Sequence, residues 1–193
     1  MYILFIFLAV VLFYVWSLYN RFVSGKTRIK ASVQEIGNQL KRQADLIPNL
    51  VETAKAYLKH EKGIFDELTK ARKSLLSATE KGDLQQMVDA GESVSRALTP
   101  LFALVESNPE LKGVEAVSKL MDELRDTADK LMYSRRTLID LTADYNIMVV
   151  SFPSNILAKL FKFGSEKGLT TRESGEHLSV SEKEEVSPKV DLK

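Results

Sequence analysis

The sequence predicts an all-α protein in which an N-terminal transmembrane helix is followed by an antiparallel bundle of long helices. Three observations support this fold class. The first 20 residues carry no charged side chain, apolar residues recur at spacings of three and four along most of the remaining chain, and no segment shows the alternation typical of a β-strand. We therefore divide the chain into an anchor at 1–20, a helical bundle at 21–163 and a charged tail at 164–193.

The first 20 residues are predicted to cross a membrane. As a helix they would extend over about 30 Å, which matches the hydrocarbon layer of a bilayer. Tyr14, Trp16 and Tyr19 lie near the end of this run, where aromatic rings favour the headgroup region. A cleaved signal peptide is the main alternative, but such peptides begin with basic residues and end in an A-x-A-like site. This run has neither feature, so we expect an uncleaved anchor.

Basic residues directly after the anchor predict its orientation. Arg21, Lys26, Arg28 and Lys30 precede the first acidic residue, Glu35, whereas the N-terminal side carries no charged side chain. The positive-inside rule then places the N-terminus outside and residues 21 onward in the cytoplasm. We expect the same four basic side chains to attract anionic lipid headgroups.

A long apolar stripe with helical spacing covers residues 24–79. Pro48 lies inside this stripe, and proline removes a backbone donor and clashes with the preceding turn. Either the helix kinks at Pro48, which gives three long helices and one short one, or a new helix starts there, which gives four. We expect a kink, because the stripe keeps its phase across Pro48 and no glycine is near it.

Two further long helices are predicted. Gly82-Asp83 marks a break, and Asp83 is expected to cap a helix that runs to about Glu106 and kinks at Pro100. The next segment, Ser107-Asn108-Pro109-Glu110, predicts a turn. The third long helix then spans about 110–151 and ends at the Phe152-Pro153 pair, because the residue before a proline disfavours helix.

The last parts of the chain are a short amphipathic segment and a polar tail. Residues 154–163 are apolar on one side and basic on the other, with Ser154 or Asn155 as the expected cap. This segment is either a membrane-surface helix or a helix packed on the bundle, and we favour the bundle. The tail at 164–193 holds seven acids, five bases and few apolar residues, so we expect it to be disordered.

Composition and motifs argue against several function classes. The net charge of +1 gives no basic excess for nucleic acid. The absence of cysteine excludes disulfides, thiolate nucleophiles and cysteine metal sites. Because no catalytic or phosphate-binding motif occurs, we expect no enzymatic activity, no metal and no cofactor. One alternative is a small-molecule- or metal-binding bundle, which requires four polar residues to converge in one pocket: Asp45, Asn49, Tyr145 and Asn146.

The stretch at 39–62 is the most distinctive block of the sequence. Its core comprises Leu40, Lys41, Arg42, Asp45, Leu46, Ile47, Pro48, Asn49, Leu50, Val51 and His60-Glu61. Further pieces follow it or precede it in a fixed order: Tyr19-Asn20, Ala71-Arg72, Asn108-Pro109-Glu110-Leu111-Lys112, Tyr145-Asn146, and Phe152-Pro153 with Asn155. Together these motifs resemble those of the LemA family over residues 1 to about 163. Departures from the family pattern indicate a divergent member, and they lie at Gly37, Gln43, Ala128 and Leu138-Ile139.

The resemblance implies an anchored cytoplasmic four-helix bundle in the bacterial inner membrane, with no enzymatic activity and no cofactor. Genes of the family often neighbour a heat-shock membrane metalloprotease, and one branch acts in magnetosome membrane formation. We accordingly expect a single-pass interaction or scaffold protein whose partners are the lipid bilayer and further copies of itself. The alternative is an adaptor or regulator of a membrane protease or envelope stress system, with a membrane protein as its partner.

Overall fold

The computed structural model describes residues 1–58 and 61–170. Within these ranges it contains helices and no strand, which confirms the all-α prediction. The helices are α1 (Tyr2–Lys55), α2 (Lys62–Lys81), α3 (Leu84–Ser107), α4 (Pro109–Lys112), α5 (Glu115–Val150) and α6 (Ser154–Leu160).

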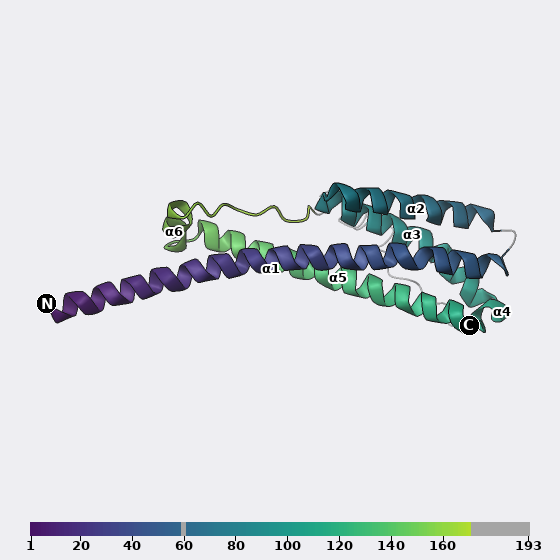
Figure 1. The fold of residues 1–193 in the computed structure, drawn as a ribbon, viewed down its shortest axis with the longest axis horizontal. Coiled ribbons are helices and arrows are strands. Elements are labelled where there is room, and N and C mark those ends of the chain that lie inside the picture. Colours follow the sequence, from purple (N-terminus) through teal and green to yellow (C-terminus); the bar gives the residue numbers. More distant parts are fainter. Residues whose placement is uncertain (59–60, 171–193) are drawn as a thin grey trace, which may run out of the picture.

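The four long helices form two antiparallel pairs. α1 lies along α5, and α2 and α3 form a hairpin that packs against α1 (Figure 1). The 54 residues of α1 form one helix with a length of about 80 Å. Its N-terminal part extends beyond the rest of the molecule (Figure 1), and its first buried residue is Leu18. From there on, buried side chains recur at helical spacing, including Phe22, Ile29, Ile36, Leu40, Ile47 and Leu50.

α1, α3 and α5 meet at a glycine of α3. A Cβ added at Gly91 would lie 2.5 Å from Cδ2 of Leu40 on α1 and 3.6 Å from Cδ2 of Leu131 on α5. Leu40 is fully buried, so its side chain has little room to move away. The absence of a side chain at Gly91 therefore sets how closely α3 can approach the α1–α5 pair.

The expected cap of α3 is confirmed. The Asp83 carboxylate accepts a hydrogen bond from the Gln86 backbone N–H at 2.9 Å and caps α3. Asn108 caps the short helix α4, which begins at Pro109, by accepting from the Glu110 and Leu111 N–H groups. The third long helix differs from expectation in its first turn, because residues 109–112 form α4 and the chain breaks before α5 begins at Glu115.

The start of α6 also differs from expectation. Neither Ser154 nor Asn155 caps this helix, and Pro153 stands at its N-cap position. The Ser154 hydroxyl instead donates to the carbonyls of Met148 at 2.6 Å and Ser151 at 2.8 Å. Ser154 therefore ties α6 to the last turn of α5.

The first long helix continues through Pro48, as the favoured alternative requires, but it ends well before residue 79. α1 runs through Pro48 without interruption and ends at Lys55, and α2 begins at Lys62. The bundle thus gains its fourth long helix from a turn after Lys55 and not from a break at Pro48. α3 likewise runs through Pro100, which is exposed to solvent. His60, part of the distinctive sequence block, lies outside the described residues.

An arginine explains how α1 continues through Pro48. Proline leaves the carbonyl four residues earlier without its helical donor, and that carbonyl belongs to Ala44, which is fully buried. Arg72 of α2 donates from Nε to the Ala44 oxygen at 2.6 Å. The sequence alone does not indicate this role of Arg72, although a buried carbonyl freed by proline requires a donor.

Part of the predicted tail packs on the bundle. Residues 164–170 run in an extended path along the molecule (Figure 1), and Glu166 and Thr170 hydrogen-bond to α5 and α3, respectively. Specific polar contacts therefore hold a segment that is too poor in apolar residues to form a core. The remainder of the tail, at 171–193, lies outside the described residues.

A double-mutant cycle tests the role of Arg72. In the natural chain, Arg72→Met leaves the buried Ala44 carbonyl without a donor and should lower the free energy of unfolding by about 1–3 kcal/mol. In a Pro48→Ala background the new backbone N–H can pair with that carbonyl, so the same substitution should cost clearly less. Chemical unfolding followed by circular dichroism measures both costs. Equal costs in the two backgrounds would contradict the idea that Arg72 replaces the backbone donor that Pro48 lacks.

Candidate functional site

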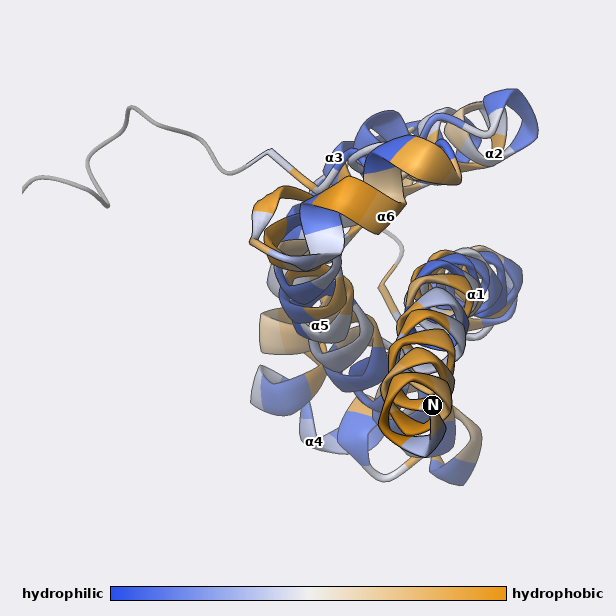
Figure 2. Cartoon of the chain, turned by 90° about the vertical axis from the view of Figure 1, so that its left-hand side faces the viewer, coloured by the Kyte–Doolittle hydropathy of each residue, from blue (hydrophilic) through white to orange (hydrophobic). Residues whose placement is uncertain are grey.

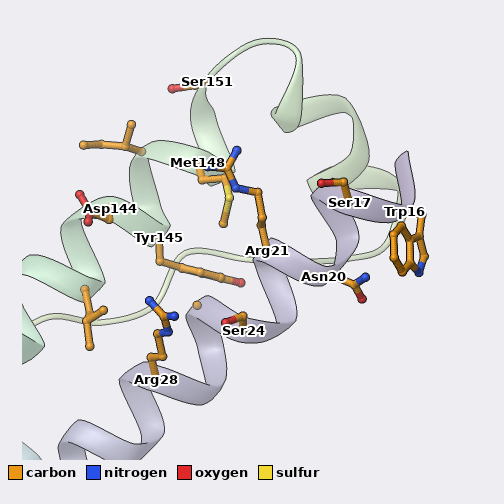
Figure 3. Close-up of a pocket in the computed structure, with 13 residues that line it drawn as sticks. Trp16, Ser17, Asn20, Arg21, Ser24, Arg28, Asp144, Tyr145, Met148 and Ser151 are labelled. Carbon is orange, nitrogen blue, oxygen red and sulfur yellow. The ribbon is translucent and has the colours of Figure 1, made fainter. Parts of the chain in front are cut away.

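A groove lies between α1 and α5, where α1 leaves the bundle. It has a volume of about 810 Å³. Its α1 wall consists of residues spaced three and four apart, so they share one helical face, and α5 supplies the opposite wall (Figure 3). The α1 wall is Trp16, Ser17, Asn20, Arg21, Ser24, Gly25 and Arg28, and the α5 wall includes Asp144, Tyr145, Met148 and Ser151. We call this feature the α1–α5 groove.

A tyrosine packed on a glycine forms the floor of the groove. Tyr145 points from α5 towards α1 (Figure 3), and a Cβ added at Gly25 would lie 3.0 Å from Cδ2 of its ring. The ring also makes an edge contact with Phe22, with 6.1 Å between centroids. Gly25 therefore allows α1 and α5 to approach closely enough to enclose the aromatic ring.

The Tyr145 hydroxyl is a buried polar group. It is shielded from solvent and finds no hydrogen-bond partner among the described residues. Burial raises the pKa of Tyr145, while the neighbouring Lys26 lowers it and Glu166 raises it. Tyr145 thus stays neutral at physiological pH, and its hydroxyl is a buried donor.

The rim of the groove carries an excess of positive charge. The lining contains two guanidinium groups, those of Arg21 and Arg28, and one carboxylate, that of Asp144 (Figure 3). Both arginines are exposed. Guanidinium groups bind phosphate and carboxylate oxygens well because their donors form a planar fork. Among residues 1–58 and 61–170, no three His, Asp or Glu side chains come close enough to hold a metal ion. Two guanidinium groups and one carboxylate thus leave the lining of the groove with a net positive charge.

The extended segment at 163–170 covers the other side of α1. Phe163 stacks on Phe22, with ring centroids 4.8 Å apart. The Asn146 side chain exchanges two hydrogen bonds with the backbone of Glu166, each 2.9 Å long. The Glu166 carboxylate also lies 2.9 Å from Lys26 Nζ, and this hydrogen bond raises the pKa of Lys26. The adjacent residues Tyr145 and Asn146 thus hold α1 and the extended segment together.

The anchor and interface residues predicted from sequence fall into three environments. Tyr14 and Trp16 are exposed on the projecting part of α1, whereas Tyr19 contacts Phe161 and Phe163 at 5.1 and 5.6 Å between ring centroids. Arg21 and Arg28 line the α1–α5 groove, and Lys26 and Lys30 line a second hollow beside Phe163. The four basic residues therefore surround α1 and do not form one cluster.

The block at 40–51 divides into buried and exposed faces. Leu40, Ile47, Leu50 and Val51 are buried in the bundle, and Leu46 is half-buried. The exposed residues of the block are Lys41, Arg42, Asp45, Pro48 and Asn49. Arg42 lies 3.6 Å from Glu123 and 3.9 Å from Asp126 of α5. The apolar half of this block therefore packs helices together.

The four polar residues of the small-molecule hypothesis do not converge. Asp45 and Asn49 are exposed on α1, whereas Tyr145 of α5 packs on Gly25 of α1. Gly25 lies 20 residues before Asp45 on α1, or about 30 Å away along the helix axis. Asn146 bonds to the backbone of Glu166. The pocket that this hypothesis requires is therefore not formed by these residues.

Sequence reasoning missed Gly25 and Glu166. Gly25 carried a readable signal, because it lies on α1 between the buried residues Phe22 and Ile29, where a glycine indicates close helix approach. Glu166 carried none, since its contacts join distant parts of the chain. Phe163 lies in the amphipathic segment at 154–163, whose apolar side is expected to pack on the bundle, but its partner Phe22 could not be named from the sequence.

Comparison with known proteins agrees with the resemblance to the LemA family. A model of the LemA family matches residues 32–182, which is most of the chain. The chain is also 23% identical over 168 residues to the magnetosome protein MamQ of Magnetospirillum gryphiswaldense. This match covers 75% of the present chain and 62% of the length of MamQ.

Two glycines of α1 provide a matched test of the Tyr145 contact. Gly25→Ala would press on the Tyr145 ring, so we expect a loss of about 1 kcal/mol or more in the free energy of unfolding. Gly37→Ala would place its Cβ 3.5 Å from Met87 Cε, an ordinary contact, and should gain about 0.5–1 kcal/mol from helix propensity. Chemical unfolding of both variants measures the difference. Equal stabilisation of the two would contradict the close approach.

Proposed function

The chain belongs to the LemA family, and from this premise we propose that it is a non-enzymatic, single-pass protein of the bacterial inner membrane. Its helical bundle lies in the cytoplasm and acts as an interaction or scaffold domain. The observation that carries this proposal is the continuity of α1, which joins an apolar segment directly to the bundle core.

The exposure of the apolar segment favours an anchor over a core helix. The most apolar window of α1 has a mean hydropathy of 2.3, and only 6% of it is buried. A core helix of this composition would bury its side chains against neighbours. The run instead projects from the bundle (Figure 1), and a bilayer offers it an apolar solvent of matching thickness.

The charges around α1 support the proposed orientation. The basic residues Arg21, Lys26, Arg28 and Lys30 follow the uncharged run within about three turns of helix. Such residues are retained on the cytoplasmic side during insertion. The bundle, which starts at the same point of α1, would then lie in the cytoplasm.

The scaffold role rests on what the bundle offers to other molecules. α1, α2, α3 and α5 form a rigid rod held at the membrane by a helix without a flexible spacer. The α1–α5 groove presents the guanidinium groups of Arg21 and Arg28 to an anion. A rigid surface at fixed height suits the positioning of other proteins.

Reporter fusions test the orientation. A cytoplasm-active reporter after Lys193 should be active, and an export-dependent reporter there should be inactive. Replacing the four basic residues after the anchor by glutamine should weaken this bias, because it removes the charges that the positive-inside rule counts. Activity of only the export-dependent reporter in the natural chain would contradict the proposal.

Self-association forms part of the proposal. Met132, Tyr133 and Ile139 are exposed on α5, and exposed large apolar side chains favour contacts between copies. We expect native mass measurement in detergent to detect a dimer or a larger assembly, and Tyr133→Glu to shift the distribution towards the monomer. Glu67→Gln on exposed α2 serves as the control. A particle that stays monomeric at every usable concentration would contradict self-association.

A further inference from the structure

α6 and the residues that flank it expose apolar side chains at one end of the bundle. Phe152, Ile156, Leu160 and Phe161 are 81%, 57%, 69% and 43% exposed, respectively. Ile156 and Leu160 lie one turn apart on the same side of α6. The other side of the helix packs on the bundle through Leu157 and Ala158. We call the four exposed residues the α6 apolar face.

The orientation of α6 differs from that of the bundle helices. Figure 2 views the molecule from the end at which the N-terminal part of α1 projects. In this view α6 lies across the end of the bundle, and much of its ribbon is hydrophobic. A bilayer crossed by α1 would therefore meet α6 side-on, which is the arrangement of an interfacial helix.

Contacts with Tyr19 fix the height of α6 along α1. The Tyr19 ring lies 5.1 Å from that of Phe161, with an angle of 69° between the ring planes. Tyr19 is the penultimate residue of the uncharged run, where a membrane-spanning helix reaches the headgroup region. α6 is therefore held at the depth at which Tyr19 would meet the headgroups.

The charges near the α6 apolar face match an anionic surface. Lys159 and Lys162 are exposed on the same short segment, and Arg21 is exposed on the neighbouring turn of α1. Segments of this composition bind membranes through apolar insertion combined with attraction between basic side chains and anionic lipids.

We propose that α6 lies in the headgroup region of the bilayer crossed by α1 and inserts Phe152, Ile156 and Leu160 between lipids, with Lys159 and Lys162 contacting anionic headgroups. This inference rests on the proposed function, because it requires α1 to span a membrane. It adds a second attachment point, which fixes the tilt and rotation of the bundle on the membrane.

Environment-sensitive labels test this arrangement in the full chain. The chain has no cysteine, so each variant carries one labelled thiol. The test positions are Ile156→Cys and Leu160→Cys, Leu8→Cys reports on the span, and Glu67→Cys on exposed α2 is the control. The proteins are placed in vesicles of phosphatidylethanolamine and phosphatidylglycerol, with or without a lipid that carries a nitroxide quencher near its headgroup.

We expect the quencher to reduce the fluorescence at positions 156 and 160 by at least about twofold, because an interfacial helix lies within about 5–10 Å of the headgroup boundary. The label at position 67 should be unaffected. Combining Lys159→Gln and Lys162→Gln should weaken quenching at position 156, because fewer charges attract the anionic lipid.

Each other outcome has a distinct meaning. If the emission of the label at position 8 indicates an apolar environment but the labels at 156 and 160 behave like that at 67, the membrane span stands and the inference about α6 fails. If the unlabelled Ile156→Cys chain forms a disulfide between copies under oxidising conditions, a second molecule covers the α6 apolar face and the inference also fails. Quenching that is unchanged by the lysine substitutions would contradict the proposed contact of Lys159 and Lys162 with anionic headgroups. If the emission of the label at position 8 indicates an aqueous environment, the proposed membrane anchor itself fails.

Discussion

The continuity of α1 is the constraint on which the rest of the structure depends. One helix carries an apolar surface suited to lipid and, after Leu18, a stripe of buried residues that contacts the other helices. A continuous helix transmits its direction and rotation along its whole length, because each turn is fixed by backbone hydrogen bonds to the next. The face that α1 presents to α5 therefore determines which face of the projecting segment lies near α6. Because packing begins at Leu18, inside the uncharged run, little space remains between the bundle and a membrane crossed by that run.

Two local solutions keep α1 continuous and close to its neighbours. At Pro48 the missing backbone donor is replaced by Arg72, which links α1 to α2 through the Ala44 carbonyl. A hydrogen bond from a charged donor to a buried carbonyl is stronger than a neutral one, so the proline strengthens the contact between helices instead of breaking the helix. At Gly25 the absence of a side chain admits the Tyr145 ring. In both cases a residue that weakens an isolated helix gains a specific partner from another helix.

The sequence was informative where the signal is local. Apolar periodicity predicted the helical fold, Asp83 predicted the start of α3, and Phe152-Pro153 marked the end of α5. The turn after Lys55 could not be predicted, because residues 56–61 contain neither glycine nor proline and the break depends on how α2 packs back on α1. The contacts of Arg72, Phe163 and Glu166 are equally hidden, since each joins segments far apart in the chain. Asp45 and Asn49 show the converse, because their place in a distinctive block suggested a site, and the fold leaves them exposed and apart from Tyr145.

The segment from Phe152 to Thr170 completes one end of the bundle and explains why apolar residues remain outside it. Leu157 and Ala158 fill the space that α6 can reach between α1 and α5, Phe163 stacks on Phe22, and Thr170 reaches Gln85 of α3. With these positions occupied, Ile156 and Leu160 have no internal site left and face outward. In water such exposure costs about 25 cal/mol for each Å² of apolar surface. The same residues lie at the height of Tyr19, at the end from which the apolar part of α1 projects, so a single bilayer would remove both apolar surfaces from water. Under the two proposals, the anchor and α6 are two parts of one adaptation to an apolar solvent.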